Sequence, residues 1–94
     1  MPTVEQPLRE AEFDELFSRF VRGVERVEPG RLRLELEPTA EVAATAADLV
    51  VRETGCCSFF TFALIATGGG LRLEISVPDK QRAVLDVLSE RAGR

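Results

Sequence analysis

Two adjacent cysteines, Cys56 and Cys57, carry the most specific chemistry that this sequence offers. They are the only cysteines among its 94 residues, and Glu53 stands three positions before the first of them. Two thiolates and a carboxylate suit thiophilic ions such as Hg(II), Cu(I), Zn(II) or trivalent arsenic. We therefore expect a soft metal or metalloid site at Glu53, Cys56 and Cys57, which two copies in a dimer would expand to four sulfurs.

The same cysteine pair also fits a purely structural role. Free cysteine packs as a small apolar side chain, and this pair precedes the phenylalanine-rich stretch from Ser58 to Phe62. Redox chemistry is the third interpretation, but a helix C-terminus and Glu53 both add negative charge, which disfavours a reactive thiolate. The cysteines are thus ion ligands, core residues or, less in keeping with the local charge, a redox pair.

Histidine is absent from the sequence, as are tryptophan and tyrosine. Histidine-based acid–base catalysis, Ser/His/Asp and Cys/His triads and histidine-rich zinc sites are therefore excluded within one chain. An enzyme ranks third as a function, behind an ion-binding protein and a non-catalytic interaction module.

Sixteen acidic and twelve basic residues give a formal net charge of −4, with the basic residues scattered among acidic ones. A nucleic-acid-binding surface needs clustered positive charge, so the chain by itself is not expected to bind nucleic acid. No apolar run approaches the ~18 residues of a membrane helix, and the N-terminus has no signal-peptide pattern. We expect a soluble cytoplasmic protein with reduced thiols and no membrane contact.

Three segments have the apolar spacing of amphipathic helices. The first spans about residues 8–27 and should stop at Pro29-Gly30. The second should begin after Thr39, a candidate N-cap, and end near Gly55, which fits the position just past a helix end. The third opens at Pro78-Asp79, with Asp79 as its candidate N-cap. Their expected buried sides are Phe13, Leu16, Phe17, Phe20 and Val24 in the first, Val42, Ala46, Leu49 and Val50 in the second, and Val84, Val87, Leu88 and Arg91 in the third.

Three strands are expected between these helices. Residues 31–37 alternate polar and apolar, and residues 59–67 and 71–77 read as a hairpin joined by three glycines. The inward residues should be Leu32, Leu34, Leu36, Leu71, Leu73, Ile75 and Val77. On the outer face, glutamates at 35, 37 and 74 could act as an acid–base pair. Interspersed arginines at 31, 33 and 72 instead favour a solvated cross-strand charge ladder.

The resulting order, α-β-α-β-β-α, predicts a single α+β domain over residues 1–94. We expect a two-layer sandwich with a three-stranded sheet of order 1-3-2 and helices on one face, close to a truncated ferredoxin-like fold. The strand at 59–67 would then lie at an edge, with Phe60, Phe62 and Leu64 on one face and Phe59, Ala63 and Ile65 on the other. The second apolar face needs a cover, either a homodimer contact or the first helix wrapping round.

The stretch from Arg52 to Phe62, Arg-Glu-Thr-Gly-Cys-Cys-Ser-Phe-Phe-Thr-Phe, followed by Leu-Arg-Leu-Glu-Ile at 71–75 and Val-Pro at 77–78, resembles a bacterial Glu-x-x-Cys-Cys-Pro-Phe module. That module occurs as small stand-alone proteins of unknown role and as the tail of some MerR-type regulators linked to heavy metals. The resemblance covers roughly residues 49–88, with Ser58 where the commoner pattern has proline. It implies thiol-based ion sensing or buffering by Cys56 and Cys57, with Glu53 as a motif residue and a regulatory protein as a partner. No helix-turn-helix precedes the module here, so a transcriptional role for this chain alone is not expected.

Overall fold

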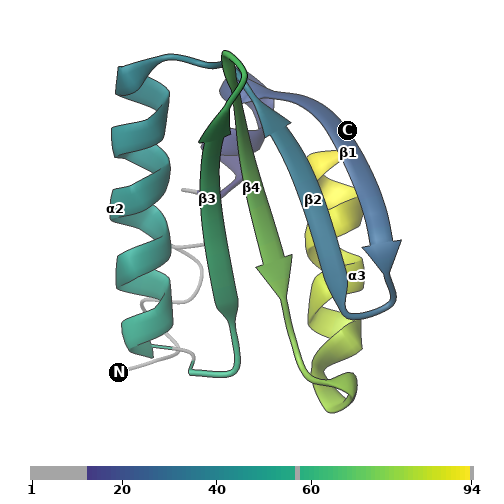
Figure 1. Ribbon diagram of the computed structural model, residues 1–94. Coiled ribbons are helices and arrows are strands. Elements are labelled where there is room, and N and C mark those ends of the chain that lie inside the picture. Colours follow the sequence, from purple (N-terminus) through teal and green to yellow (C-terminus); the bar gives the residue numbers. More distant parts are fainter. Residues whose placement is uncertain (1–12, 57, 94) are drawn as a thin grey trace.

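The computed structural model describes residues 13–56 and 58–93, except for the side chain of Cys56. These residues form one four-stranded antiparallel sheet of order β1-β2-β4-β3, with helices packed on one of its faces (Figure 1). The α+β class expected from the sequence is confirmed. In chain order the elements are a helical segment of residues 13–20, β1 (Val21–Glu28), β2 (Arg31–Leu36), α2 (Ala40–Cys56), β3 (Thr61–Thr67), β4 (Gly70–Ser76), a 3₁₀ turn (Asp79–Gln81) and α3 (Arg82–Ala92).

The prediction that the first helix continues to residue 27 is wrong, because residues 21–28 form strand β1. This strand pairs with β2 through the turn at Pro29-Gly30, and Val24 lies opposite Leu34. Valine is stiff in a helix and Gly23 lowers helix propensity, while pairing with β2 satisfies the backbone of the segment. The sheet therefore has four strands built as two hairpins, rather than the three strands of a truncated ferredoxin-like fold. Within it, β2, β4 and β3 keep the predicted relative order.

The apolar core lies between the helices and one face of the sheet. Strands β2 and β4 alternate buried and partly exposed residues, as their sequence pattern predicts. Full burial of one leucine stabilises the fold by roughly 1.5–3 kcal/mol, so this layer is the main source of stability. Its largest fully buried side chains are Leu16, Leu32, Leu34, Val42, Leu73, Ile75 and Leu85.

Helix α2 begins as predicted but ends later. The backbone N–H of Val42 donates to the Oγ1 of Thr39 at 3.1 Å, which confirms Thr39 as the N-cap. Gly55 does not end the helix, because α2 continues to Cys56. Among the described residues, positive φ angles occur at Gly68 and Gly69, where they form the tight turn between β3 and β4. The buried side of α2 consists of the four predicted residues together with Glu53.

The last helix is preceded by a 3₁₀ turn, which corrects two predictions. Asp79 opens this turn and is not the N-cap of α3, a position that Gln81 holds without a side-chain capping bond. A 3₁₀ turn has three residues per turn instead of 3.6, so it shifts the phase of the helix that follows. The buried stripe of α3 consists of Leu85, Leu88 and Ala92, whereas Val84 and Val87 are 36% and 49% exposed.

Candidate functional site

Helix α2 carries two of the three residues predicted to bind an ion. Glu53 and Cys56 stand three positions apart in its last turns, and Cys56 is the final helical residue. One helical turn is 3.6 residues, so the two positions lie one above the other along the helix. The predictions for the Cys56 side chain and for all of Cys57 lie outside the described residues.

Glu53 is buried, with 8% of its surface exposed. It is the one charged residue in the buried set of the described chain. Burial of a carboxylate is costly unless positive charge or hydrogen-bond donors compensate for the lost water. Apolar packing alone therefore does not account for a glutamate on the buried side of α2.

The surroundings of Glu53 are set by the C-terminal end of α2. The last turn of this helix contains no basic residue, and a helix C-terminus carries partial negative charge. Arg52, the neighbouring cation in sequence, forms an ion pair with Asp48 at 3.0 Å on the exposed side of the helix. The helix itself thus adds no positive charge within its last turn.

The residues after the cysteines enter the aromatic part of the core. The ring centroids of Phe59 and Phe60 lie 4.6 Å apart, and those of Phe60 and Phe62 lie 5.2 Å apart. Phe13 of the N-terminal helical segment completes the cluster at 6.4 Å from Phe62. Phe59 lies in the turn before β3 and packs against the core, so the prediction that it belongs to the outer face of the strand is wrong. That face retains Ala63 and Ile65.

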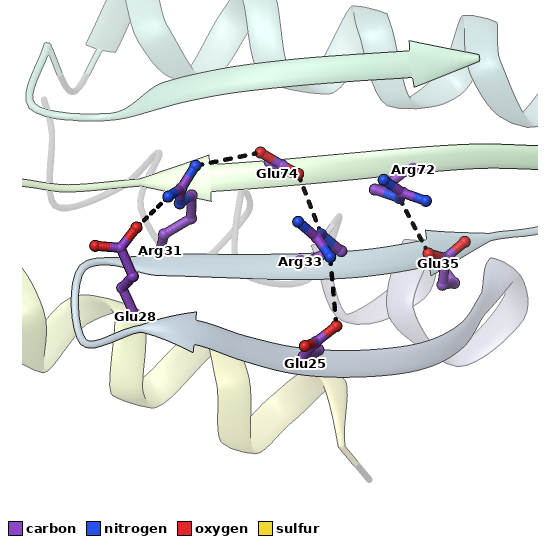
Figure 2. Close-up of polar contacts among 7 residues, drawn as sticks. All are labelled: Glu25, Glu28, Arg31, Arg33, Glu35, Arg72 and Glu74. Carbon is purple, nitrogen blue, oxygen red and sulfur yellow. Dashed lines mark hydrogen bonds and ion pairs between the residues drawn. The ribbon is translucent and has the colours of Figure 1, made fainter. Parts of the chain in front are cut away.

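The face of the sheet opposite the helices carries the predicted charge ladder (Figure 2). Glu74 on β4 contacts Arg33 on β2 at 3.1 Å, and Arg33 reaches Glu25 on β1 at 3.5 Å. Arg72 and Glu35 form a further pair between β4 and β2, also at 3.1 Å. The register places these residues directly opposite one another. The acidic residues of this face are therefore held in ion pairs with arginines, which supports the ladder over an acid–base pair.

One end of the ladder is closed by Arg31. It pairs with Glu28 across the β1–β2 turn and reaches Glu74 at 3.9 Å (Figure 2). The hydrogen bond to Glu28 raises the pKa of the Arg31 guanidinium above its ordinary value, so this group stays charged. The contribution of Glu25 escaped the sequence prediction because this residue falls within the predicted helix, and that of Glu28 because the segment before Pro29-Gly30 was not predicted to be a strand. The signal that could have found them is the Pro-Gly turn between two segments rich in β-branched or alternating residues.

The described residues contain no cluster of side chains that could hold a metal ion by itself. Across residues 13–55 and 58–93, no three Asp, Glu, His or Cys side chains are grouped so as to hold a metal ion. A cleft between the start of α2 and the β3–β4 turn is lined by Pro38, Thr39, small residues and Leu71, without an ionisable side chain. None of the described helices is long and apolar enough to cross a membrane.

Comparison with known proteins finds no significant relative of this chain. No protein-family model matches the chain. No curated protein and no solved structure matches it significantly. The fold itself is a small α+β sandwich built on a four-stranded sheet.

Proposed function

We propose that this protein binds a thiophilic metal or metalloid ion through Cys56 and Cys57, with Glu53 as a third donor. The observation that supports the proposal is the burial of Glu53 one helical turn before Cys56, at a helix end without a basic residue in its last turn. A bound cation would offset the partial negative charge of the helix end. It would also stabilise the thiolate forms of the cysteines, which are the forms that bind metal.

The chemistry of the donors selects the ions. Two sulfurs and one carboxylate favour Hg(II), Cu(I), Zn(II) or trivalent arsenic over hard ions such as Mg(II). We propose that the protein works in the cytoplasm, where the thiols stay reduced, and as a homodimer. A regulatory protein partner belongs to the same proposal, whereas nucleic acid binding by the chain alone does not.

Native mass spectrometry of the reduced protein with a panel of these ions tests the proposal, because it measures ion stoichiometry and oligomeric state together. We expect one of the soft ions to bind, and Cys56→Ser and Cys57→Ser each to weaken its binding sharply. Serine is close to cysteine in size but lacks the soft donor. Equal affinity of the wild type and the double Cys56→Ser, Cys57→Ser variant would refute the proposal.

Glu53→Gln separates the carboxylate from the thiols in the same assay. Glutamine keeps the size and loses the charge, so ion affinity should fall less than in the serine variants. Asp48→Asn is the matched control, since Asp48 lies on the exposed side of the same helix. An affinity unchanged by Glu53→Gln would remove Glu53 from the site and leave the cysteines in place.

A non-catalytic interaction module with structural cysteines is the second candidate. The observation that favours it is the packing of Phe59, Phe60 and Phe62 directly after the pair, which continues into the core. In that case no soft ion binds, and the serine substitutions cost ~1–3 kcal/mol of stability through a buried hydroxyl. Chemical denaturation of the metal-free variants therefore distinguishes the two candidates.

A further inference from the structure

Helix α2 carries an uncharged stripe on its exposed surface. The stripe follows the i, i+4, i+7, i+11, i+14 spacing of one helix face. Its one valine, Val51, is 69% exposed, the most of any large apolar side chain among the described residues. The stripe consists of Ala40, Ala44, Ala47, Val51 and Thr54.

The two flanks of α2 face opposite ways. Its charged flank, with Glu41, Asp48 and Arg52, lines a cleft shared with the helical segment 13–20. Ala40, in contrast, lines the cleft shared with the β3–β4 turn. The uncharged stripe therefore lies on the β3 side of the helix, and α2 stands beside β3 at one end of the sheet (Figure 1).

Strand β3 continues this uncharged surface. Residues 61–67 contain no charged residue and no proline, and their pairing with β4 has no register shift. Among the described strands, β3 has β4 as its one neighbour. The α2 stripe and β3 together are termed the uncharged side below. In a chain with 30% charged residues, such a surface is the place where a partner is expected.

The opposite edge of the sheet is protected. Strand β1 carries four charged residues and two register shifts in its pairing with β2. Arg26 of this strand also forms an ion pair with Asp86 of α3 at 2.8 Å. Charges and irregular pairing are the features by which proteins prevent strand addition at an edge. In the described part of the chain, β3 is therefore the edge strand suited to contact with another chain, and β1 is the edge strand protected against it.

We propose that the uncharged side is the interface of a two-fold homodimer, in which α2 packs against α2 and β3 faces β3 of the second copy. Each chain has a net charge of −4, so two copies repel each other least where neither presents a charge. The two helices would run antiparallel, which opposes their dipoles favourably. Alanines in the stripe allow the helix axes to approach to roughly 8 Å.

The sequence of β3 is complementary to itself. In an antiparallel arrangement centred on Leu64, each larger side chain beside the centre faces a small one, and like residues meet at both ends. The facing pairs are Phe62 with Ala66, Ala63 with Ile65, and Thr61 with Thr67.

The charges on β4 fit the same arrangement. Ala63 lies beside Glu74, and Ile65 lies beside Arg72. Across the strands of the dimer, Glu74 and Ala63 of one copy are therefore followed by Ile65 and Arg72 of the second copy. Opposite charges then flank the contact on both sides of the axis, which favours a second copy over a partner of one charge sign.

Sedimentation velocity of the reduced, metal-free full chain, over a concentration series reaching the high micromolar range, tests this interface. We expect a monomer–dimer equilibrium that Val51→Glu weakens on the order of 100-fold, because the two-fold axis brings two like charges together. Val87→Glu is the matched control, since this valine is exposed on α3, which packs beside β1 and β2. It should leave the equilibrium unchanged. Circular dichroism should show both variants folded, because both side chains are exposed.

Three outcomes would overturn the proposal. A wild-type protein that remains a monomer throughout the series would leave the uncharged side to a different protein. A Val51→Glu variant that dimerises like the wild type would place the interface elsewhere. Equal weakening by Val87→Glu would mean that charge alone, and not the uncharged side, governs association. Because no ion is present, these outcomes do not depend on the ion-binding proposal.

Discussion

Gly30 and Val77 are in direct backbone contact: the N–H of Val77 donates to the carbonyl oxygen of Gly30 at 2.9 Å. A Cβ atom on Gly30 would lie 2.8 Å from the carbonyl oxygen of Val77, closer than real Cβ contacts come. The turn between β1 and β2 is thus locked against the end of β4. The proline and glycine that read as a helix stop serve instead to bring β1 onto the sheet.

Gly30→Ala should therefore destabilise the protein by ~1–3 kcal/mol, because the added methyl group displaces backbone that cannot move freely. Gly55→Ala is the control, since a Cβ at Gly55 meets nothing within 4 Å and this residue is helical. Alanine there should stabilise the fold by ~0.5–1 kcal/mol. Urea denaturation of both variants measures the difference, and equal stability would contradict the packing of the β1–β2 turn.

The charge ladder gives a second prediction. The Glu74 side chain is 14% exposed and contacts both Arg33 and Arg31, so its loss leaves two arginines with one carboxylate fewer. Glu74→Gln should cost on the order of 1 kcal/mol, more than an isolated surface pair contributes. The control is Glu15→Gln, because Glu15 is 66% exposed in its pair with Arg19 and should change stability by less than ~0.5 kcal/mol. Thermal unfolding at low and high salt measures both, and the Glu74 effect should shrink with added salt.

The thiols of Cys56 and Cys57 should react slowly. A helix C-terminus with a nearby buried glutamate disfavours the thiolate, so a disulfide probe at neutral pH should react no faster than with free cysteine. Stopped-flow measurement on the reduced, metal-free protein gives this rate, with Glu53→Gln as the comparison. A rate well above that of free cysteine would point to a redox protein instead.

The sequence predicted those parts of the fold whose pattern and partners are local. The alternation at Leu32, Leu34 and Leu36 specifies which face of the strand is buried, because a shift of one residue would expose all three side chains. The buried side of α2 and its N-cap at Thr39 follow from a regular helical period in the same way. These features were therefore confirmed together with the relative order of the three predicted strands.

Strand β1 escaped prediction because its valines, at positions 21, 24 and 27, have helical spacing. Only pairing with β2, a contact between segments, decides against the helix. The buried stripe of α3 was predicted wrongly for a related reason. The 3₁₀ turn before this helix shifts its phase, and apolar periodicity gives no sign of that turn. At the candidate site, the sequence located Glu53, but its burial is a property of how α2 packs against the sheet and could not be read from the residue alone.

Ile65→Lys tests the sheet half of the uncharged side. Ile65 is partly exposed on the ladder face, opposite Arg72, so a lysine there has room to reach water and should leave the monomer folded. In a dimer the same lysine would lie beside the axis, facing Ala63 of the second copy, where burial of its charge is opposed. Sedimentation should therefore show a monomer at concentrations where the wild type is dimeric. Val84→Lys on α3, at a valine 36% exposed, adds the same charge on the helix that packs beside β1 and β2 and should stay dimeric.

The pair of variants also decides how ion binding and assembly are related. In an antiparallel pair of α2 helices the two C-terminal ends, which carry Cys56, lie at opposite ends of the dimer, so each chain should bind its own ion. Ile65→Lys should then leave ion affinity per chain unchanged in native mass spectrometry. A loss of affinity in Ile65→Lys that Val84→Lys does not show would mean that the copies share sulfurs in a different arrangement. A dimer that persists in Ile65→Lys would remove β3 from the interface and leave the α2 stripe as its only proposed contact.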